Sequence, residues 1–279
     1  MCASASACGG ASAVVSVADA AVRSDGPVLC NDPDPSAGSV CPVEVRGRVV
    51  DENDAPIDAL VVSVCAGLCF FGATDAQGTF SVTPDAHIVV DSYALELHGR
   101  PSRISYYTPL PAGGTALSYG TALPLPQLPA SGTAIVGDGT AQSVVGGDIT
   151  LAIGAGTKAL FNVEDFGIEH GHDLRVVSIA NPASLPFVDA AHPPRALWAL
   201  APFETGFSAK VPVTLANTTA LAAGTAVELK VMGGLVLDAP PAGHLAHAAF
   251  GHVSADGKTI TTDPGEGIVE LTFVALEVL

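Results

Sequence analysis

Histidines gather in two short segments of this sequence, and imidazole is the side chain most often used to bind transition metals. Five of the eight histidines are the candidate ligands: His170, His172, His244, His247 and His252. In a strand, His170 and His172 lie on the same face. In a single helical turn, His244 and His247 would also lie on the same face. If the two segments meet, the imidazoles predict a site for Zn²⁺, Cu²⁺ or Ni²⁺, with Glu169 or Asp173 as a further ligand. The alternative is that these histidines are solvated loop side chains without a ligand.

Calcium is the second candidate ion, because acidic residues occur near the turns of the first half of the chain. These residues are Asp51, Asp54, Asp75 and Asp85. The twelve-residue calcium loop of EF-hand proteins does not occur. The competing interpretation is that the aspartates cap tight turns.

The residue patterns of common hydrolases are missing. No Gly-x-Ser-x-Gly sequence occurs, and carboxylate pairs such as Glu164 and Asp165 are adjacent, so in a strand they point to opposite faces. Tyr106 and Tyr107 could form a platform for a sugar ring, whereas Trp198 lies in an apolar strand and is expected in the core. We therefore expect no enzymatic activity.

All six cysteines lie in the first quarter of the chain. Cys65 and Cys69 flank a three-residue loop with a central glycine, which could place them opposite each other in a hairpin. Cys30 and Cys41 bracket a polar loop and form the second predicted disulfide. A redox or metal pair is the alternative for Cys65 and Cys69, but a spacing of three residues does not match the thioredoxin motif. Structural disulfides predict an oxidising compartment.

The N-terminal ten residues contain Cys2 followed by small residues, without a basic or apolar signal region. This stretch resembles the mature N-terminus of a bacterial lipoprotein, and the resemblance implies that Cys2 carries the lipid. An ordinary Ala- and Ser-rich terminus is the alternative.

Composition restricts the partners of this protein. Twenty-eight acidic residues against 11 basic ones give a net charge of −17, which repels nucleic acids and anionic lipid surfaces. The most apolar window, residues 59–73, is too short to span a bilayer as a helix. Any membrane attachment would then depend on the N-terminal lipid, and the expected partners are other envelope proteins or copies of the chain itself.

Glycine and proline total 51 of 279 residues, and apolar residues alternate with polar ones over many short stretches. Both features predict an all-β protein made of two antiparallel β-sandwich domains in tandem. We divide the chain into a disordered tether over 1–40, a first sandwich over 41–110, a Pro- and Gly-rich linker over 111–131 and a second sandwich over 132–279.

The first sandwich has a distinctive order of motifs. Gly47-Arg48-Val49-Val50-Asp51 is followed by Ala55-Pro56-Ile57, Val61-Val62-Ser63-Val64 and Thr74-Asp75-x-x-Gly78-x-Phe80. This order resembles the carboxypeptidase regulatory-like domain, a transthyretin-like sandwich. The resemblance implies a structural or binding accessory module.

The second sandwich shows the same alternation, for example at Ile149, Leu151 and Ile153, and Asp256-Gly257 is typical of a hairpin turn. The segments 146–156 and 198–215 resemble a ZU5-like domain. Some members of that family cleave themselves at His-Phe-Ser, whereas this chain has His252-Val253-Ser254.

Together these observations predict a non-enzymatic structural or binding module that is exported and lies in the periplasm, at the outer membrane or on the cell surface. Three alternatives remain: an accessory protein for a metal ion or glycan, a subunit of a fibre or layer, and a metal-dependent hydrolase.

Overall fold

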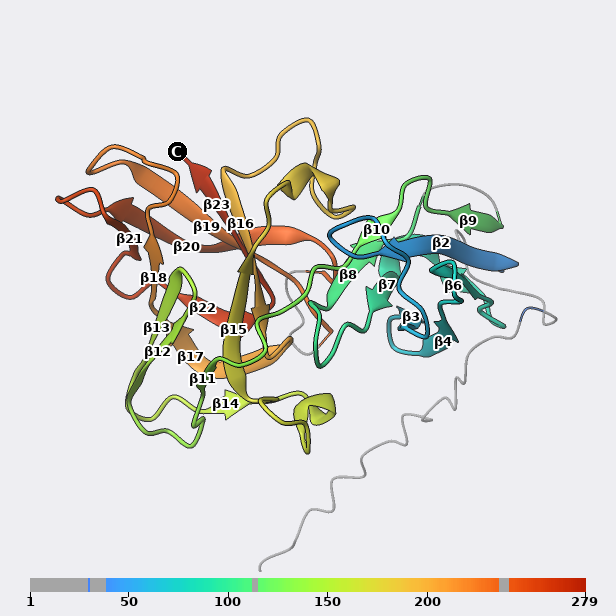
Figure 1. Cartoon of the computed structure of the whole chain (residues 1–279), viewed down its shortest axis with the longest axis horizontal. Coiled ribbons are helices and arrows are strands. Elements are labelled where there is room, and N and C mark those ends of the chain that lie inside the picture. The colour runs from blue at the N-terminus through green and yellow to red at the C-terminus, as the bar shows by residue number, and fades with distance from the viewer. Residues whose placement is uncertain (1–29, 31–38, 112–114, 236–240) are drawn as a thin grey trace, which may run out of the picture.

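A computed structural model describes residue 30 and residues 39–111, 115–235 and 241–279. The chain forms two β-rich lobes that lie side by side (Figure 1). In the described residues, helical structure is limited to the short 3-10 turns η1 (Val90–Ser92), η2 (Val163–Asp165) and η3 (Pro182–Ser184). The all-β prediction is therefore confirmed. No helix in this part of the chain is long and apolar enough to cross a bilayer.

The first lobe is a small sandwich built on two four-stranded sheets. One sheet contains β10 (Leu123–Pro124), β2 (Glu44–Val50), β5 (Thr79–Val82) and β9 (Ala116–Ser118). The other has the order β4 (Cys69–Ala73), β3 (Val61–Cys65), β7 (Ala94–Leu97) and β8 (Tyr106–Pro109). A two-stranded pair of β1 (Ser39–Val40) and β6 (Ile88–Val89) completes the lobe.

The segment 111–131 differs from the linker that we expected. Its strands β9 and β10 both pair with β2 in parallel, and its leucines 117, 123, 125 and 128 are buried in the first lobe's core. Proline lacks a backbone N–H, which confines it to strand edges, and β10 with Pro124 is the outermost strand of its sheet. The expected tether 1–40 lies almost wholly outside the described residues, as does Cys2, and the structure describes only Cys30 and the end of the tether in β1.

The second lobe contains one large sheet and one small one. The large sheet has ten strands, in the order β11 (Thr133–Ala134), β15 (Asp173–Ser178), β16 (Ala196–Ala201), β23 (Phe273–Val278), β19 (Ala226–Met232), β20 (Leu245–Val253), β21 (Thr259–Thr262), β18 (Val213–Ala216), β13 (Ile149–Ile153) and β12 (Gln142–Gly146). The small sheet joins β14 (Ala159–Leu160), β17 (Thr205–Val211) and β22 (Ile268–Leu271). The ten-stranded sheet curls so far that its two ends touch. Thr133 Oγ1 of β11 donates to the Val145 carbonyl of β12 at 2.7 Å.

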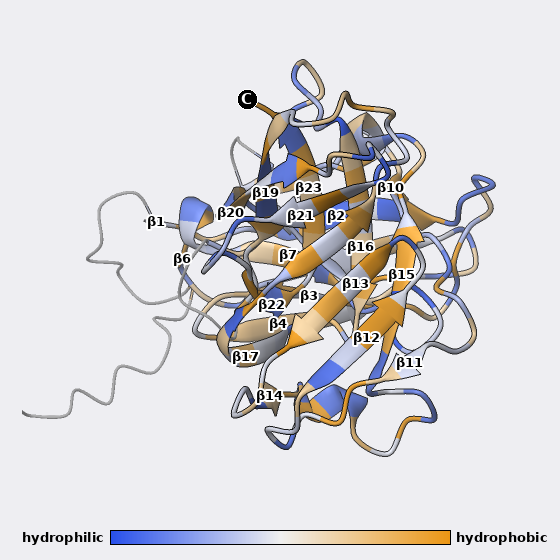
Figure 2. Ribbon diagram, turned by 90° about the vertical axis from the view of Figure 1, so that its left-hand side faces the viewer, coloured by the Kyte–Doolittle hydropathy of each residue, from blue (hydrophilic) through white to orange (hydrophobic). Residues whose placement is uncertain are grey.

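The two lobes share one hydrophobic core. Leu197, Ala199 and Ala201 on one face of β16 pack into the first lobe's cluster, whereas Trp198 and Leu200 on the other face pack inside the second lobe. Strand β23 behaves in the same way, and Phe273 contacts Tyr106 of β8 with ring centroids 6.2 Å apart. Apolar residues are concentrated on the strands throughout (Figure 2). The contact between the lobes is therefore a packed interior rather than a flexible connection.

Both predicted disulfides are present. Cys65 and Cys69 face each other directly at the end of the β3–β4 hairpin, with Cα atoms 4.2 Å apart. Cys30 is bonded to Cys41 over a Cα distance of 5.6 Å.

Candidate functional site

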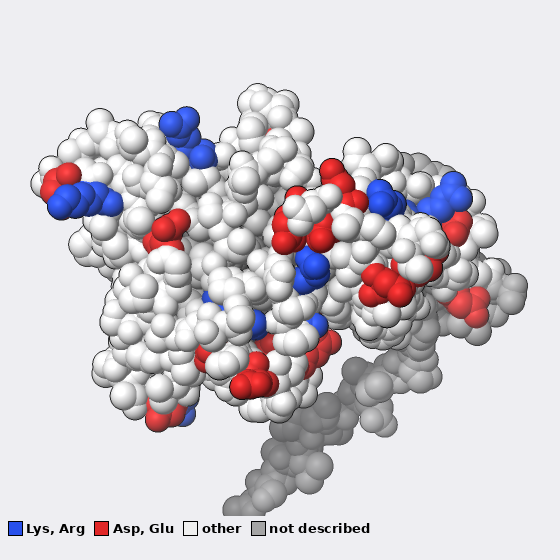
Figure 3. Space-filling model, in the orientation of Figure 1, with Lys and Arg blue, Asp and Glu red and all other residues white. Residues whose placement is uncertain are grey.

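Charged side chains from both lobes meet beside the shared core, and we call them the joint cluster. Its members are Glu96, His98 and Arg100 from the first lobe and Glu164, Asp165 and Glu204 from the second. On the face drawn in Figure 3, charged groups stand on both lobes against a largely uncharged surface. Glu96, Asp165 and Glu204 are buried, which distinguishes the cluster from these surface charges.

Local structure fixes both halves of the cluster. Glu96 lies in β7, and His98 and Arg100 follow in the β7–β8 connection, which closes tightly at Gly99. A Cβ atom at Gly99 would lie 1.8 Å from the Ile104 carbonyl oxygen, so a side chain does not fit there. In the second lobe, Asn162 caps η2 by accepting a hydrogen bond from the Glu164 N–H at 3.0 Å.

The imidazole of His98 stands between two carboxylates. His98 Nε2 lies 3.3 Å from Glu96 Oε2, and His98 Nδ1 lies 3.6 Å from Glu164 Oε2. Ser63 Oγ of β3 is 2.8 Å from the same Nε2. Glu96, His98 and Glu164 each offer one ligating atom, and these atoms lie within 4.8 Å of one another. It is the one such group of three found in the described part of the chain.

Arg100 of the first lobe forms hydrogen bonds with three residues of the second lobe. Its Nε donates to Asp165 Oδ1 at 3.0 Å, its Nη1 to Glu164 Oε2 and its Nη2 to the Phe203 carbonyl at 2.6 Å. The guanidinium also lies over the Phe203 ring, 5.5 Å from the centroid. Its side chain is only 9% exposed, and the contact with the buried Asp165 is shielded from solvent, whereas the side chain of Glu164 is 46% exposed.

A second pair of acidic side chains extends the cluster into the second lobe. Glu204 and Glu270 converge on Gly234, where an added Cβ atom would lie 2.6 Å from Glu204 Oε1 and 2.9 Å from Glu270 Oε1. The Leu235 N–H donates to Glu204 Oε1 at 2.6 Å, and Asn162 Nδ2 donates to Glu204 Oε2 at 3.1 Å. Glu204 itself has a left-handed backbone with φ of 61°. Glu270 Oε1 is buried without a hydrogen-bond partner.

Burial dominates the proton affinities here. Desolvation raises the pKa of Glu96 to about 7, with His98 opposing the shift and Glu204 and Glu164 adding to it. Desolvation and the neighbouring Glu204 raise the pKa of Glu270 to about 8. The more exposed Glu164 has a lowered pKa, because His98 and Arg100 stabilise its charge.

Ser63, His98 and Glu164 follow the order of a nucleophile, a base and an orienting carboxylate. Ser63 has no exposed surface, however, and lies in a strand with a paired neighbour on each side. A substrate cannot reach its oxygen in this conformation. The geometry of the cluster is better suited to holding a cation or protons.

The five histidines predicted as metal ligands do not assemble. The strand expected over 170–172 begins only at Asp173, and β20 begins at Leu245 in place of the helical turn. Three of the five pair with a carboxylate through Nδ1: His170 with Asp173 at 2.8 Å, His247 with Glu228 at 3.0 Å and His252 with Asp263 at 2.8 Å. His170 Nε2 also lies 3.8 Å from Glu169 Oε1.

The other two have different surroundings. His172 stacks on Phe161 with centroids 3.9 Å apart, and His244 Nδ1 lies 3.2 Å from the Ala242 carbonyl oxygen. No group of three ligands within the described residues includes any of the five. Sequence reasoning missed His98, although its spacing of two from Glu96 was a usable signal.

Two of the four aspartates considered for calcium, Asp51 and Asp75, cap turns. Asp51 Oδ1 accepts hydrogen bonds from the Asn53 and Ala55 N–H groups at 2.8 and 2.9 Å. Asp75 Oδ1 accepts two from Gln77 and Thr79, both at 2.9 Å. Trp198, Tyr106 and Tyr107 are buried, so these rings offer no surface to a sugar.

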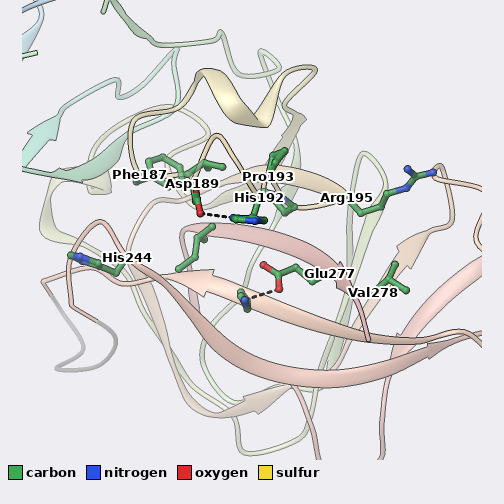
Figure 4. A pocket seen from close by; sticks show the side chains of 12 residues that line it. Phe187, Asp189, His192, Pro193, Arg195, His244, Glu277 and Val278 are labelled. Carbon is green, nitrogen blue, oxygen red and sulfur yellow. Dashed lines mark hydrogen bonds and ion pairs between the residues drawn. The ribbon is translucent and has the colours of Figure 1, made fainter. Parts of the chain in front are cut away.

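A groove of about 760 Å³ lies on the second lobe between the loop 187–195 and strands β19, β20 and β23 (Figure 4). Asp189 pairs with His192 at 2.9 Å and Lys230 with Glu277 at 2.6 Å, whereas Arg195 donates to the Thr219 carbonyl at 3.4 Å. Most charged groups of the groove therefore already have protein partners.

Comparison with known proteins gives no assignment: no protein-family model matches the sequence, and no curated protein matches it.

Proposed function

We propose that this protein is a non-enzymatic structural or binding module that works outside the cytoplasm, with other envelope proteins or copies of itself as partners. The shared core is the observation that carries the proposal. Because β16 and β23 bury both faces, the two sandwiches form one stiff body of the kind that suits a spacer or a scaffold. We further propose that the lobes are divergent relatives of the carboxypeptidase regulatory-like and ZU5-like sandwiches. The Gly78 turn, with φ of 74°, lies where the first motif expects it.

The burial of Ser63 supports the non-enzymatic part of the proposal, because this serine lies 2.8 Å from His98 Nε2 but has no access to solvent. The test is hydrolysis of chromogenic ester substrates by the purified chain and by Ser63→Ala. We expect rates equal to those in buffer for both proteins. Turnover by the wild-type protein that disappears in Ser63→Ala would overturn the proposal.

The two disulfides support an oxidising location. Fractionation of the source cells, with thiol alkylation before lysis, tests this part. We expect both cystines intact, and the protein digestible by protease added outside the inner membrane. Recovery from the cytoplasm with four reduced thiols at these positions would contradict export. Mass spectrometry of the membrane-bound fraction would show whether Cys2 carries lipid.

A further inference from the structure

We propose that Glu96, His98 and Glu164 bind a divalent transition-metal cation, with Zn²⁺ as the ion to test. The proposal does not depend on the function above. The first argument is the ligand set, because one imidazole nitrogen and two carboxylate oxygens are the donors that zinc sites use. Zinc bonds of about 2.0–2.2 Å place tetrahedral ligands roughly 3.3–3.6 Å apart. The 3.6 Å between His98 Nδ1 and Glu164 Oε2 matches that spacing, and one ligating atom from each of the three residues lies within 4.8 Å of the other two.

The second argument is charge. The joint cluster contains one guanidinium, that of Arg100, and four carboxyl groups: those of Glu96, Glu164, Asp165 and Glu204. Arg100 directs its donors at Glu164, Asp165 and the Phe203 carbonyl. Buried negative charge in excess of its counter-charge is costly. A divalent cation between Glu96 and Glu164 would offset it.

The third argument is preorganisation and access. Ser63 Oγ, at 2.8 Å from Nε2, fixes the orientation of the His98 ring, as outer-shell hydroxyl groups do at metal sites. The side chains of Glu96 and His98 are 6% and 12% exposed, whereas that of Glu164 is 46% exposed. An ion can therefore enter from the Glu164 side without separating the lobes, and water can complete its coordination.

Within the described residues, none of the other histidine–carboxylate contacts belongs to a group of three ligating atoms as close together as these. His252 pairs with Asp263 at 2.8 Å and is more exposed than His98, but it belongs to no group of three. This pair therefore serves as an internal control, since surface histidines that bind zinc nonspecifically would include it.

The experiment is equilibrium dialysis of the EDTA-treated full chain against ZnCl₂, with bound metal measured by elemental analysis. The variants are Glu164→Gln, His98→Gln, Glu96→Gln and the control His252→Gln. We expect one Zn²⁺ per chain in the wild type and in the control. Loss of an outer-shell partner weakens metal binding by about 10- to 100-fold, so loss of a direct ligand should weaken it by more than about 100-fold.

Glu164→Gln is the decisive variant, because Glu164 is half-exposed and glutamine keeps the shape of its side chain, and circular dichroism checks that the variant is folded. Wild-type affinity in Glu164→Gln overturns the proposal, as does equal loss of zinc in His252→Gln. Absence of stoichiometric zinc in the wild type, or binding of Ca²⁺ in preference to Zn²⁺, also overturns it.

Discussion

Replacing Glu270 by glutamine should make the protein more stable at high pH and leave it nearly unchanged at low pH. In the folded chain, desolvation first and Glu204 second raise the pKa of Glu270 from 4.5 to about 8. The folded state therefore holds a proton that the unfolded state has lost between roughly pH 4.5 and 8. Stability falls as pH rises through this window, since the unfolded state binds fewer protons. Each pKa unit is worth about 1.4 kcal/mol, so the carboxyl group costs about 5 kcal/mol at most above pH 8.

Glutamine has the same shape, cannot ionise, and can donate an N–H to the Glu204 carboxylate. Urea unfolding at pH 5, 7 and 9, followed by the fluorescence of the single buried Trp198, measures the effect. Glu266→Gln is the matched control, because it removes a carboxylate that pairs with Lys210 near the surface and changes net charge equally. We expect the difference in free energy of unfolding between Glu270→Gln and this control to grow by several kcal/mol from pH 5 to pH 9, in favour of Glu270→Gln. A constant difference across that range would refute the reasoning.

Three further changes test the joint and the disulfide. Phe273→Ala should lower the free energy of unfolding by about 3–5 kcal/mol. Calorimetry of the wild type and of this variant should show a single unfolding transition, because the lobes share a core. Two resolved transitions would contradict the shared core. Arg100→Ala leaves the buried Asp165 without its guanidinium partner and should lower the free energy of unfolding, measured by chemical denaturation, by about 3–5 kcal/mol. A decrease below about 1 kcal/mol would mean that the contact is not buried in solution. Replacing both Cys65 and Cys69 by serine should lower stability by about 2 kcal/mol, since the closed loop is short, and an unchanged melting midpoint would show that the bond does not form.

Alternating hydrophobicity predicted the longer strands well because most of them have at least one buried face. Ile149, Leu151 and Ile153 of β13 are buried as the pattern requires, and the Cys65–Cys69 hairpin has the expected register. What the alternation could not predict is burial on two faces. The stretch Ala196–Ala201 contains no polar residue, which is typical of strands covered on both sides. That signal was available, but a single sequence does not say which surface covers the second face.

The segment 111–131 was assigned to a linker because its prolines exclude a central strand. That argument holds for the backbone hydrogen bonds between strands, since β10 is an edge strand. The side chains of an edge strand can still be buried in the core. Leu123 and Leu125 alternate with Pro124 and Pro126 and are fully buried. Alternate leucines within a proline-rich stretch therefore indicate an edge strand of a core more strongly than the prolines indicate a linker.

The joint cluster illustrates why sites between lobes are hard to derive from one sequence. Glu164 and Asp165 were set aside because adjacent residues in a strand point to opposite faces, and this objection fails in a 3-10 turn. In η2 both carboxylates reach Arg100, one through Nη1 and the other through Nε. The apolar centre of the contact supplies most of its free energy, whereas a guanidinium that must satisfy three acceptors at once allows few orientations. The contacts of Arg100 therefore restrict the orientation of the lobes, and in this orientation Glu164 Oε2 lies 3.6 Å from His98 Nδ1.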